Sequence, residues 1–290
     1  MSSSRPDPAL DAAVATAAGS SEPINVALMH ILLAAPSETA ARAALARATV
    51  SDRVTALTAL LDACPGAFDR LAAIRALEQP TRGGAASPAL WKTLFDRAAE
   101  IDEGAAVALY ALGRADLLAA ATGEIIASLA ADDLLSPAST VLDFGCGAGR
   151  LMAALAPRVG RVVGVELSAH MAEAAGRAIA EDGNAMVVRG DGRDLAFLVT
   201  GGFDLIVALD SFPYVAAEGE ERVIEQLAEF RRLLAGGGRV RILNYAYAGD
   251  HADRAWSIAR LAAVAGLRVL AARPGGFAHW DGELFDLAVA

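Results

Sequence analysis

Cysteine, lysine and histidine are scarce in this chain of 290 residues. Cys64 and Cys146 are its only cysteines and form no CxxC pair, so they cannot build a disulfide framework. Lys92 is the only lysine and the formal net charge is −10, which disfavours binding to nucleic acid or to an anionic membrane. The four histidines are scattered and offer no zinc-binding spacing.

Long hydrophobic runs are also missing. No apolar run approaches the length that spans a bilayer, although 55% of the residues are hydrophobic and many of these are alanine. Asp7, Pro8 and Asp11 interrupt residues 1–20, which therefore lack the apolar core of a secretion signal. We expect these residues to form a loose tail. We also expect a cytoplasmic protein, because few cysteines suit a reducing compartment.

The first part of the chain has a helical pattern. Apolar residues recur at spacings of three and four between residues 24 and 77. A Pro/Gly-containing break over residues 79–84 predicts a linker. Ser87 followed by Pro88 predicts the start of a further helix. We therefore predict an N-terminal helical region over residues 1–85 and a second domain over residues 86–290.

After Ser139, short β-branched runs alternate with helical segments, which predicts a parallel sheet with helices on both faces. The link Arg273–Glu283 is too short for a helical crossover, so the last strand is expected to run antiparallel. We predict an α/β fold with a doubly wound seven-stranded sheet. The predicted strands are Thr140–Phe144, Arg161–Glu166, Ala185–Arg189, Phe203–Leu209, Arg239–Leu243, Leu267–Ala272 and Leu284–Val289.

Three glycines follow the first predicted strand at a turn into a helix. Gly145, Gly147 and Gly149 allow a tight turn and the close approach of a ligand. Arg150 stands where a dinucleotide-binding fingerprint needs glycine or alanine, so the turn is not a standard pyrophosphate site. Asp143, just before the glycines, suits an ammonium group better than a pyrophosphate.

Two further acids end the next two predicted strands. Glu166 stands where a carboxylate can accept both hydroxyls of a ribose, and Asp191 stands where an exocyclic amine could be met. The carboxyl ends of parallel strands lie at one edge of a sheet, so these acids and Asp143 are expected to converge on one crevice. Together they suit a ligand with a cationic head, a ribose and an amino-purine.

These motifs resemble those of the class I S-adenosylmethionine-dependent methyltransferases. The run Asp143–Gly149 is similar to the first motif of that family, and Glu166 is similar to its acidic post-motif residue. Asp191 resembles the third acid. Residues 203–210 resemble the fourth-strand motif, and residues 233–239 resemble the turn into strand five, where Ala235-Gly236 replaces the more common Pro-Gly.

The resemblance implies a Rossmann-like sheet and S-adenosylmethionine as the cofactor. It implies that the glycine turn faces the methionine part, that Glu166 binds the ribose and that Asp191 binds adenine N6. It also implies that residues 90–114 cover the cofactor, although Tyr110 could equally pack in the core. The residues expected to bind the cofactor are Tyr110, Arg114, Asp143, Gly145, Cys146, Gly147, Gly149, Glu166, Leu167, Met171, Asp191, Gly192 and Leu209.

The predicted function is methyl transfer to an oxygen or nitrogen of a small molecule, such as a secondary metabolite. Metal-dependent members of the family carry an Asp-Asn pair after strand five, whereas Asn244 follows Leu243 here, so no catalytic metal is expected. Methyl transfer chiefly requires alignment and sometimes the removal of a proton. The candidate catalytic residues are Asp210, Tyr214, Tyr245, His251 and His279.

Two alternatives stay open from the sequence. The same fold can serve a cyclase, isomerase or decarboxylase that binds the cofactor without methylating a substrate. A non-catalytic protein could instead use residues 1–85 to dock another chain. Apart from a small-molecule acceptor, the expected partner is a second copy of the chain, bound through the N-terminal helical region.

Overall fold

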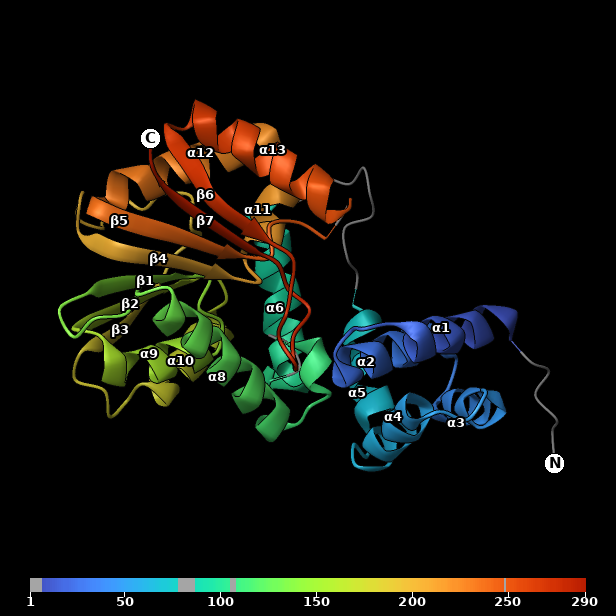
Figure 1. The fold of residues 1–290 in the computed structure, drawn as a ribbon. Coiled ribbons are helices and arrows are strands. Elements are labelled where there is room, and N and C mark those ends of the chain that lie inside the picture. Colours follow the sequence, from blue (N-terminus) through green and yellow to red (C-terminus); the bar gives the residue numbers. More distant parts are fainter. Residues whose placement is uncertain (1–6, 78–86, 105–107, 248) are drawn as a thin grey trace. The chain divides into compact units, whose positions relative to one another are not determined.

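The computed structural model describes residues 7–77, 87–104, 108–247 and 249–290. They divide into two compact units, which we call the helical unit and the sheet unit (Figure 1). The helical unit comprises the described residues of 1–78 together with 98–124 and 276–281. The sheet unit comprises the described residues of 79–97, 125–275 and 282–290.

The sheet unit contains one seven-stranded sheet in the order β3-β2-β1-β4-β5-β7-β6. The first five strands are parallel, and β7 runs antiparallel between β5 and β6, which confirms the predicted fold class. Strands β2 and β3 follow β1 on one side of it in the sheet, and β4 lies on the opposite side of β1. This reversal between β1 and β4 is where open α/β sheets bind ligands. The strands are β1 Thr140–Phe144, β2 Arg161–Glu166, β3 Ala185–Arg189, β4 Phe203–Leu209, β5 Leu234–Leu243, β6 Leu267–Arg273 and β7 Leu284–Val289.

Strand β5 begins five residues earlier than its predicted start at Arg239. The resemblance predicts a turn at the glycines before Arg239, and Gly237 does adopt a positive φ of 84°. In the structure Leu234 still pairs with Phe203, and the register between β4 and β5 then shifts before Leu205 pairs with Arg239. The glycines therefore form an irregular first half of the strand.

Helices cover both faces of the sheet. Figure 1 shows α9 (Arg150–Leu155) and α10 (Ala169–Ala178) over one face, and α12 (Glu220–Leu233) and α13 (His251–Val264) over the other. Right-handed crossovers on either side of the β1–β4 reversal require this arrangement. The core under α12 and α13 contains fully buried side chains from both layers, among them Leu142, Ile206, Ile242, Leu227, Phe230 and Leu261.

The helical unit has a hydrophobic core of its own. Leu28, Ile31, Leu57, Leu61 and Leu71 are almost completely buried in it, which is consistent with the helical spacing of the sequence. Two of its helices begin at serines, Ser37 and Ser51, whose side chains accept a backbone N–H of the first turn. Its main helices are α1 Pro8–Gly19, α2 Ile24–Ala34, α3 Glu38–Arg47, α4 Asp52–Asp62 and α5 Ala67–Arg75.

The predicted loose tail is wrong for most of its length, because α1 occupies Pro8–Gly19. The Asp7 carboxylate caps this helix by accepting the N–H groups of Ala9 and Leu10. Leu10, Val14 and Ala17 repeat at helical spacing and are buried. The polar residues at the start of the chain predicted a loose tail, but this narrow apolar stripe is enough to anchor a helix.

The compact units depart from the predicted boundary between residues 85 and 86. Residues 276–281, which follow β6, belong to the helical unit. The Asn25 amide donates to the carbonyls of Tyr110 and His279 at 2.9 Å each, and Trp280 is 1% exposed. These buried contacts attach the segment to α2. The predicted linker at residues 79–84 lies outside the described residues, while α6 (Pro88–Ile101) begins at Pro88 as expected, with Ser87 as its cap.

Among the described residues, no single helix is long and apolar enough to cross a membrane. Helices α2 and α3 pass a test of length and composition only when they are joined across a bend of 118°.

Candidate active site

The glycine turn joins β1 to α9 at the carboxyl edge of the sheet. Gly145, Gly147 and Gly149 all adopt positive φ angles, of 73°, 52° and 83°. A Cβ atom on Gly149 would lie 2.8 Å from the Cα atom of Ala175, which is backbone of α10 and has no side-chain freedom to move away. The turn therefore requires glycine for its conformation and also for the close packing of α10.

Glu166 at the end of β2 connects the glycine turn to the start of α10. Its Oε2 accepts the N–H of Gly147 at 2.8 Å, and its Oε1 accepts the N–H of Ser168 at 2.8 Å. Burial raises the pKa of this carboxyl group, while the backbone hydrogen bonds lower it and limit the rise. Each carboxylate oxygen has a second lone pair, so Glu166 can hold the turn and still accept hydroxyl groups of a ligand.

Asp143 at the end of β1 is 1% exposed, and its Oδ2 has no hydrogen-bond partner among the described residues. Burial raises the pKa of Asp143 to about 7, and nearby Glu166 adds to the rise while Arg150 opposes it. A buried carboxylate oxygen without a partner has a free-energy cost that a cationic ligand group would remove. Cys146 is buried beside it, and burial raises the pKa of its thiol well above the usual value, so it is not a thiolate nucleophile.

A contact that the sequence did not reveal joins α6 to the Glu166 end of the site. The Ser168 hydroxyl donates to Asp96 at 2.5 Å and also caps α10 by accepting the N–H of Met171. Burial would raise the pKa of Asp96, but hydrogen bonds from Lys92, Ser168 and the His170 N–H lower it overall. No sequence signal connects two residues that are so far apart in the chain.

We expect Asp96→Asn to raise the dissociation constant for S-adenosylhomocysteine about 3- to 10-fold. The change weakens one charge-assisted hydrogen bond to Ser168, which is worth about 1 kcal/mol, and so loosens the backbone N–H that orients Glu166. Isothermal titration measures the effect. Glu181→Gln, at an exposed position in the turn after α10, is the matched control. Equal affinity of Asp96→Asn and the wild type would show that Asp96 does not position the site.

The residues predicted to contact adenine lie in the sheet unit. Met171 is 1% exposed, and Leu167 is half-buried. Asp191 is exposed after β3, where its Oδ1 accepts the N–H of Arg193 and so forms a local turn. Gly192 follows with a φ of 72°, and a Cβ atom there would lie 3.0 Å from the ring of Phe144. Leu209, the last residue of β4, is 8% exposed.

The carboxyl ends of β4 and β5 carry a second polar group. Asp210 and Asn244 follow these strands with φ angles of 55° and 67°, in the left-handed region that non-glycine residues seldom adopt. The Asn244 amide donates to Asp210 Oδ1 at 2.5 Å, and Arg150 lies 3.9 Å from Asp210 Oδ2. Such backbone strain persists only where neighbouring contacts enforce it, and it clusters at functional sites.

His251 at the start of α13 lies beside a carboxylate from β7. Its Nδ1 is 3.2 Å from Glu283 Oε1, and its ring stacks on Phe285 with 5.9 Å between the ring centroids. Arg254 also donates to Glu283, from Nε at 2.8 Å. Because β7 is antiparallel, Glu283 lies at the same edge as Asn244. The Asn244 N–H donates to the Glu283 carbonyl at 2.9 Å, and the Glu283 N–H donates to the Asn244 side-chain Oδ1 at 3.0 Å. The sequence gave no signal for Glu283.

Tyr214 and Tyr245 complete the residues predicted at this edge. Burial raises the pKa of Tyr214 to about 12, although a hydrogen bond with Tyr247 opposes the rise. Tyr214 is therefore protonated at neutral pH and can donate a hydrogen bond but not accept a proton. The Tyr245 hydroxyl lies 3.1 Å from the Ser257 hydroxyl, and burial raises its pKa as well.

Three of the predicted site residues belong to the helical unit. The His279 ring contacts Glu124 Oε1 at 2.7 Å, and its backbone carbonyl accepts the Asn25 amide. Arg114 pairs with Asp116 and also donates to a backbone carbonyl. Tyr110 is 7% exposed. Each has a local packing or pairing role, and their participation in cofactor binding or catalysis stays a prediction.

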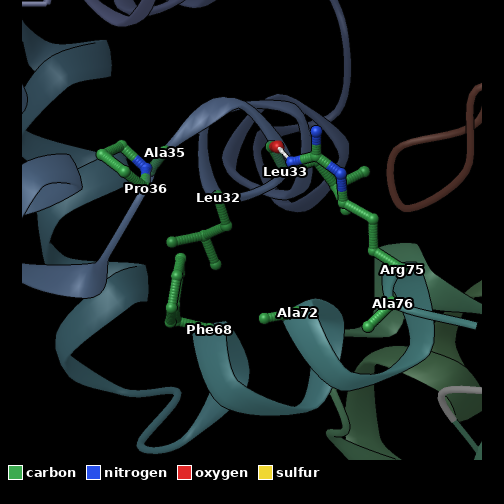
Figure 2. Close-up of a pocket in the computed structure, with 8 residues that line it drawn as sticks. All are labelled: Leu32, Leu33, Ala35, Pro36, Phe68, Ala72, Arg75 and Ala76. Atoms are coloured by element: carbon green, nitrogen blue, oxygen red, sulfur yellow. Dashed lines mark hydrogen bonds between the residues drawn. The ribbon is translucent and has the colours of Figure 1, made fainter.

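A hollow of about 310 Å³ lies between α2 and α5 of the helical unit (Figure 2). Its walls are apolar apart from Arg75, whose guanidinium donates to the Leu33 carbonyl. Small-molecule sites combine apolar walls with several converging polar groups, which this hollow does not present. In the part of the chain that the structure describes, no cluster of three or more His, Cys, Asp or Glu side chains is arranged to hold a metal ion.

Part of the chain is similar to solved structures, among them several methyltransferases. The YcgJ protein from Bacillus subtilis is 24% identical over 43% of this chain and 50% of its own, with a TM-score of 0.37. Phosphoethanolamine N-methyltransferase 1 from Haemonchus contortus is 22% identical over 54% of this chain and 32% of its own, with a TM-score of 0.47. An S-adenosylmethionine-dependent methyltransferase from Clostridium acetobutylicum is 15% identical over 58% and 90% of the two chains, with a TM-score of 0.47. The first two likenesses thus span half and about a third of the other protein.

Comparison with curated protein sequences gives no match. Residues 141–238 match the family model of a methyltransferase domain. The match begins in β1 and ends in β5, and so contains the glycine turn, Glu166 and the β1–β4 reversal. The seven-stranded sheet around this match has the Rossmann-like architecture of a methyltransferase fold. The match lies wholly within the sheet unit and leaves the helical unit unmatched.

Proposed function

We propose that this chain is an S-adenosylmethionine-dependent methyltransferase that methylates an oxygen or nitrogen atom of a small molecule, such as a secondary metabolite. The observation that carries the proposal is the carboxyl edge of the sheet. There Glu166, the glycine turn and a buried Asp143 oxygen without a partner meet beside the ends of β4 and β5. A net charge of −10 and a single lysine favour a small acceptor over nucleic acid.

The residues at this edge fit the parts of S-adenosylmethionine. Asp143 Oδ2 lacks a partner among the described residues and suits the methionine ammonium group, while the three glycines would allow the close approach of a ligand to the turn. Glu166 has lone pairs left for both ribose hydroxyls. Leu167 and Met171 line the adenine, and Asp191 accepts from its amine. When bound, the cofactor supplies an electrophilic methyl group on a sulfonium.

On the acceptor side, the enzyme must position a nucleophile and, where needed, take its proton. Of the candidate catalytic residues, His251 is the proton acceptor that we propose, because Glu283 lies beside its Nδ1 and leaves Nε2 for the acceptor. Tyr214 would donate a hydrogen bond. Asp210 is held by Asn244 and would orient neighbouring groups.

Two measurements test this function. Isothermal titration should show that S-adenosylmethionine and S-adenosylhomocysteine bind at micromolar concentrations. A screen of small-molecule acceptors with methyl-labelled cofactor should then yield one S-adenosylhomocysteine per labelled product. The proposal is wrong if neither cofactor form binds at millimolar concentration, or if product forms without S-adenosylhomocysteine.

We expect the affinity for S-adenosylhomocysteine to rise as the pH increases from 6 to about 7. With its pKa raised to about 7, Asp143 is mostly protonated at pH 6 and must lose this proton to face an ammonium group. The association constant should therefore rise by at most about 10-fold per pH unit below pH 7 and level off above it. The charged groups nearest to Asp143 are Arg150 and Glu166.

Asp143→Asn should remove this pH dependence and weaken binding at pH 8 by about 10-fold, because one charged contact is lost. Without ligand, the raised pKa of Asp143 means that the folded state holds a proton that the unfolded state releases between pH 4 and 7. The free energy of unfolding should thus fall as the pH rises through this window, and Asp143→Asn should abolish the fall. Titrations in two buffers of different ionisation enthalpy count the released proton. If the affinity and the free energy of unfolding of Asp143→Asn depend on pH as they do in the wild type, another group is responsible for the titration.

A further inference from the structure

Four aromatic rings converge beside the ends of β4 and β5 in the sheet unit. Trp91 and Phe95 lie one turn apart on α6 and pack edge to face on Tyr214, with centroid distances of 4.9 and 5.0 Å. Tyr214 belongs to α11 (Phe212–Ala217), which begins directly after β4. Tyr247, from the segment after β5, packs on Tyr214 at 6.2 Å. We call these four residues the aromatic cluster.

Two contacts place the aromatic cluster next to the cofactor residues. Three residues before Tyr214, the Ser211 hydroxyl donates to the Phe144 carbonyl at 2.6 Å, at the entrance to the glycine turn. Directly after Phe95, Asp96 accepts from Ser168, whose N–H binds Glu166. The aromatic cluster therefore lies where the ends of β1, β2 and β4 come together.

Two features of the aromatic cluster are unfavourable unless a ligand completes it. Trp91 is 9% exposed, and its indole N–H is buried without a hydrogen-bond partner among the described residues. Such a donor has a free-energy cost until an acceptor meets it. The Tyr247 side chain is 66% exposed, which leaves a large apolar ring in water at the edge of the cluster.

We propose that the aromatic cluster is the acceptor subsite, and that the acceptor is a planar aromatic compound with a ring-borne hydroxyl or carbonyl oxygen. This inference rests on the proposed function. Rings that meet edge to face favour a further aromatic ring, and the Trp91 N–H requires an oxygen on it. A cationic acceptor would also attract aromatic faces, but it offers no lone pair to the indole N–H. A ring hydroxyl would be the group that receives the methyl: its oxygen forms the new C–O bond as the C–S bond of S-adenosylmethionine breaks to leave S-adenosylhomocysteine, and its proton passes to a base at the same edge of the sheet. A ring carbonyl would only accept the Trp91 N–H.

The probe for this subsite is 4-hydroxyacetophenone, which is neutral, planar and carries both oxygen groups. It is titrated into the full-length protein saturated with S-adenosylhomocysteine, with the three tryptophans labelled with ¹⁵N. We expect the indole N–H signal of Trp91 to shift while those of Trp256 and Trp280 do not. Trp91→Phe keeps a ring and removes the donor, so it should weaken binding about 5- to 10-fold. Trp256→Phe, at an exposed position on α13, is the matched control.

Tyr247→Leu is a second variant, at an exposed position where the substitution should leave the fold intact. It should also weaken the binding of the probe. Comparison ligands are the cyclohexane analogue of the probe and tetramethylammonium. The proposal is overturned if the Trp91 signal does not shift, or if either comparison ligand binds as tightly as the aromatic probe. If the wild-type protein binds S-adenosylhomocysteine but not the probe, the proposed acceptor subsite is wrong and the proposed function still stands. Failure of S-adenosylhomocysteine to bind refutes the proposed function instead.

Discussion

Glu166→Ala should weaken the binding of S-adenosylhomocysteine on the order of 100-fold or more. The carboxylate is expected to accept two ribose hydroxyls, and each hydrogen bond to a charged group contributes about 1.5 kcal/mol or more. Two of them give about 3 kcal/mol, which is roughly 100-fold in the dissociation constant. S-adenosylmethionine should lose affinity equally, since both molecules share the ribose. Isothermal titration of both ligands checks the result.

Glu173→Ala removes an exposed carboxylate from α10 and is the matched control, for which we expect no change. The affinity of Glu166→Gln for S-adenosylhomocysteine should lie between those of Glu166→Ala and Glu173→Ala. Its amide keeps one acceptor oxygen, but its NH₂ group must face one of the two backbone N–H groups that now bind the carboxylate. If folded Glu166→Ala binds the ligand as tightly as the wild type, Glu166 is only a structural link to the glycine turn.

The sheet could be predicted in detail because each strand has a local signal. Short β-branched runs bounded by glycine or polar residues gave the bounds of β1, β2, β3, β4 and β7 as the structure has them. The short link after Arg273 required an antiparallel last strand, and β7 pairs with β5 in this way. The helix α1 escaped prediction because its core contacts come from alanine and two larger residues only, a pattern too weak to read against polar neighbours.

Asp143, Glu166 and the glycine turn, which we propose to bind the cofactor, lie at the ends of predicted strands. They could therefore be named from their spacing and from the resemblance. The contacts that complete this edge are not local. Asp96 meets Ser168 from α6, and Glu283 meets His251 from β7. Such pairs depend on how helices pack on a sheet, for which a single sequence holds no signal. The sequence likewise gave no sign that His279, a candidate catalytic residue, belongs to the helical unit.

Gly149→Ala should lower the free energy of unfolding by about 2–5 kcal/mol and abolish tight binding of S-adenosylhomocysteine. The residue has a φ of 83°, which costs an alanine about 1–2 kcal/mol. Its Cβ would lie 2.8 Å from the Cα of Ala175, and overpacking against backbone costs about 1–3 kcal/mol more. To relieve this clash, α10 must move away from the glycine turn, and Ser168 at its cap then no longer orients Glu166.

Urea unfolding and isothermal titration on Gly149→Ala measure the two effects. Gly176→Ala, one residue after Ala175 in α10, is the matched control. A Cβ atom there meets nothing closer than 4.0 Å. Since alanine is a better helix former than glycine by about 1 kcal/mol, Gly176→Ala should be as stable as the wild type or more stable, with unchanged affinity. If Gly149→Ala matches this control in stability and binding, the close packing of α10 against the glycine turn is not what shapes the cofactor site.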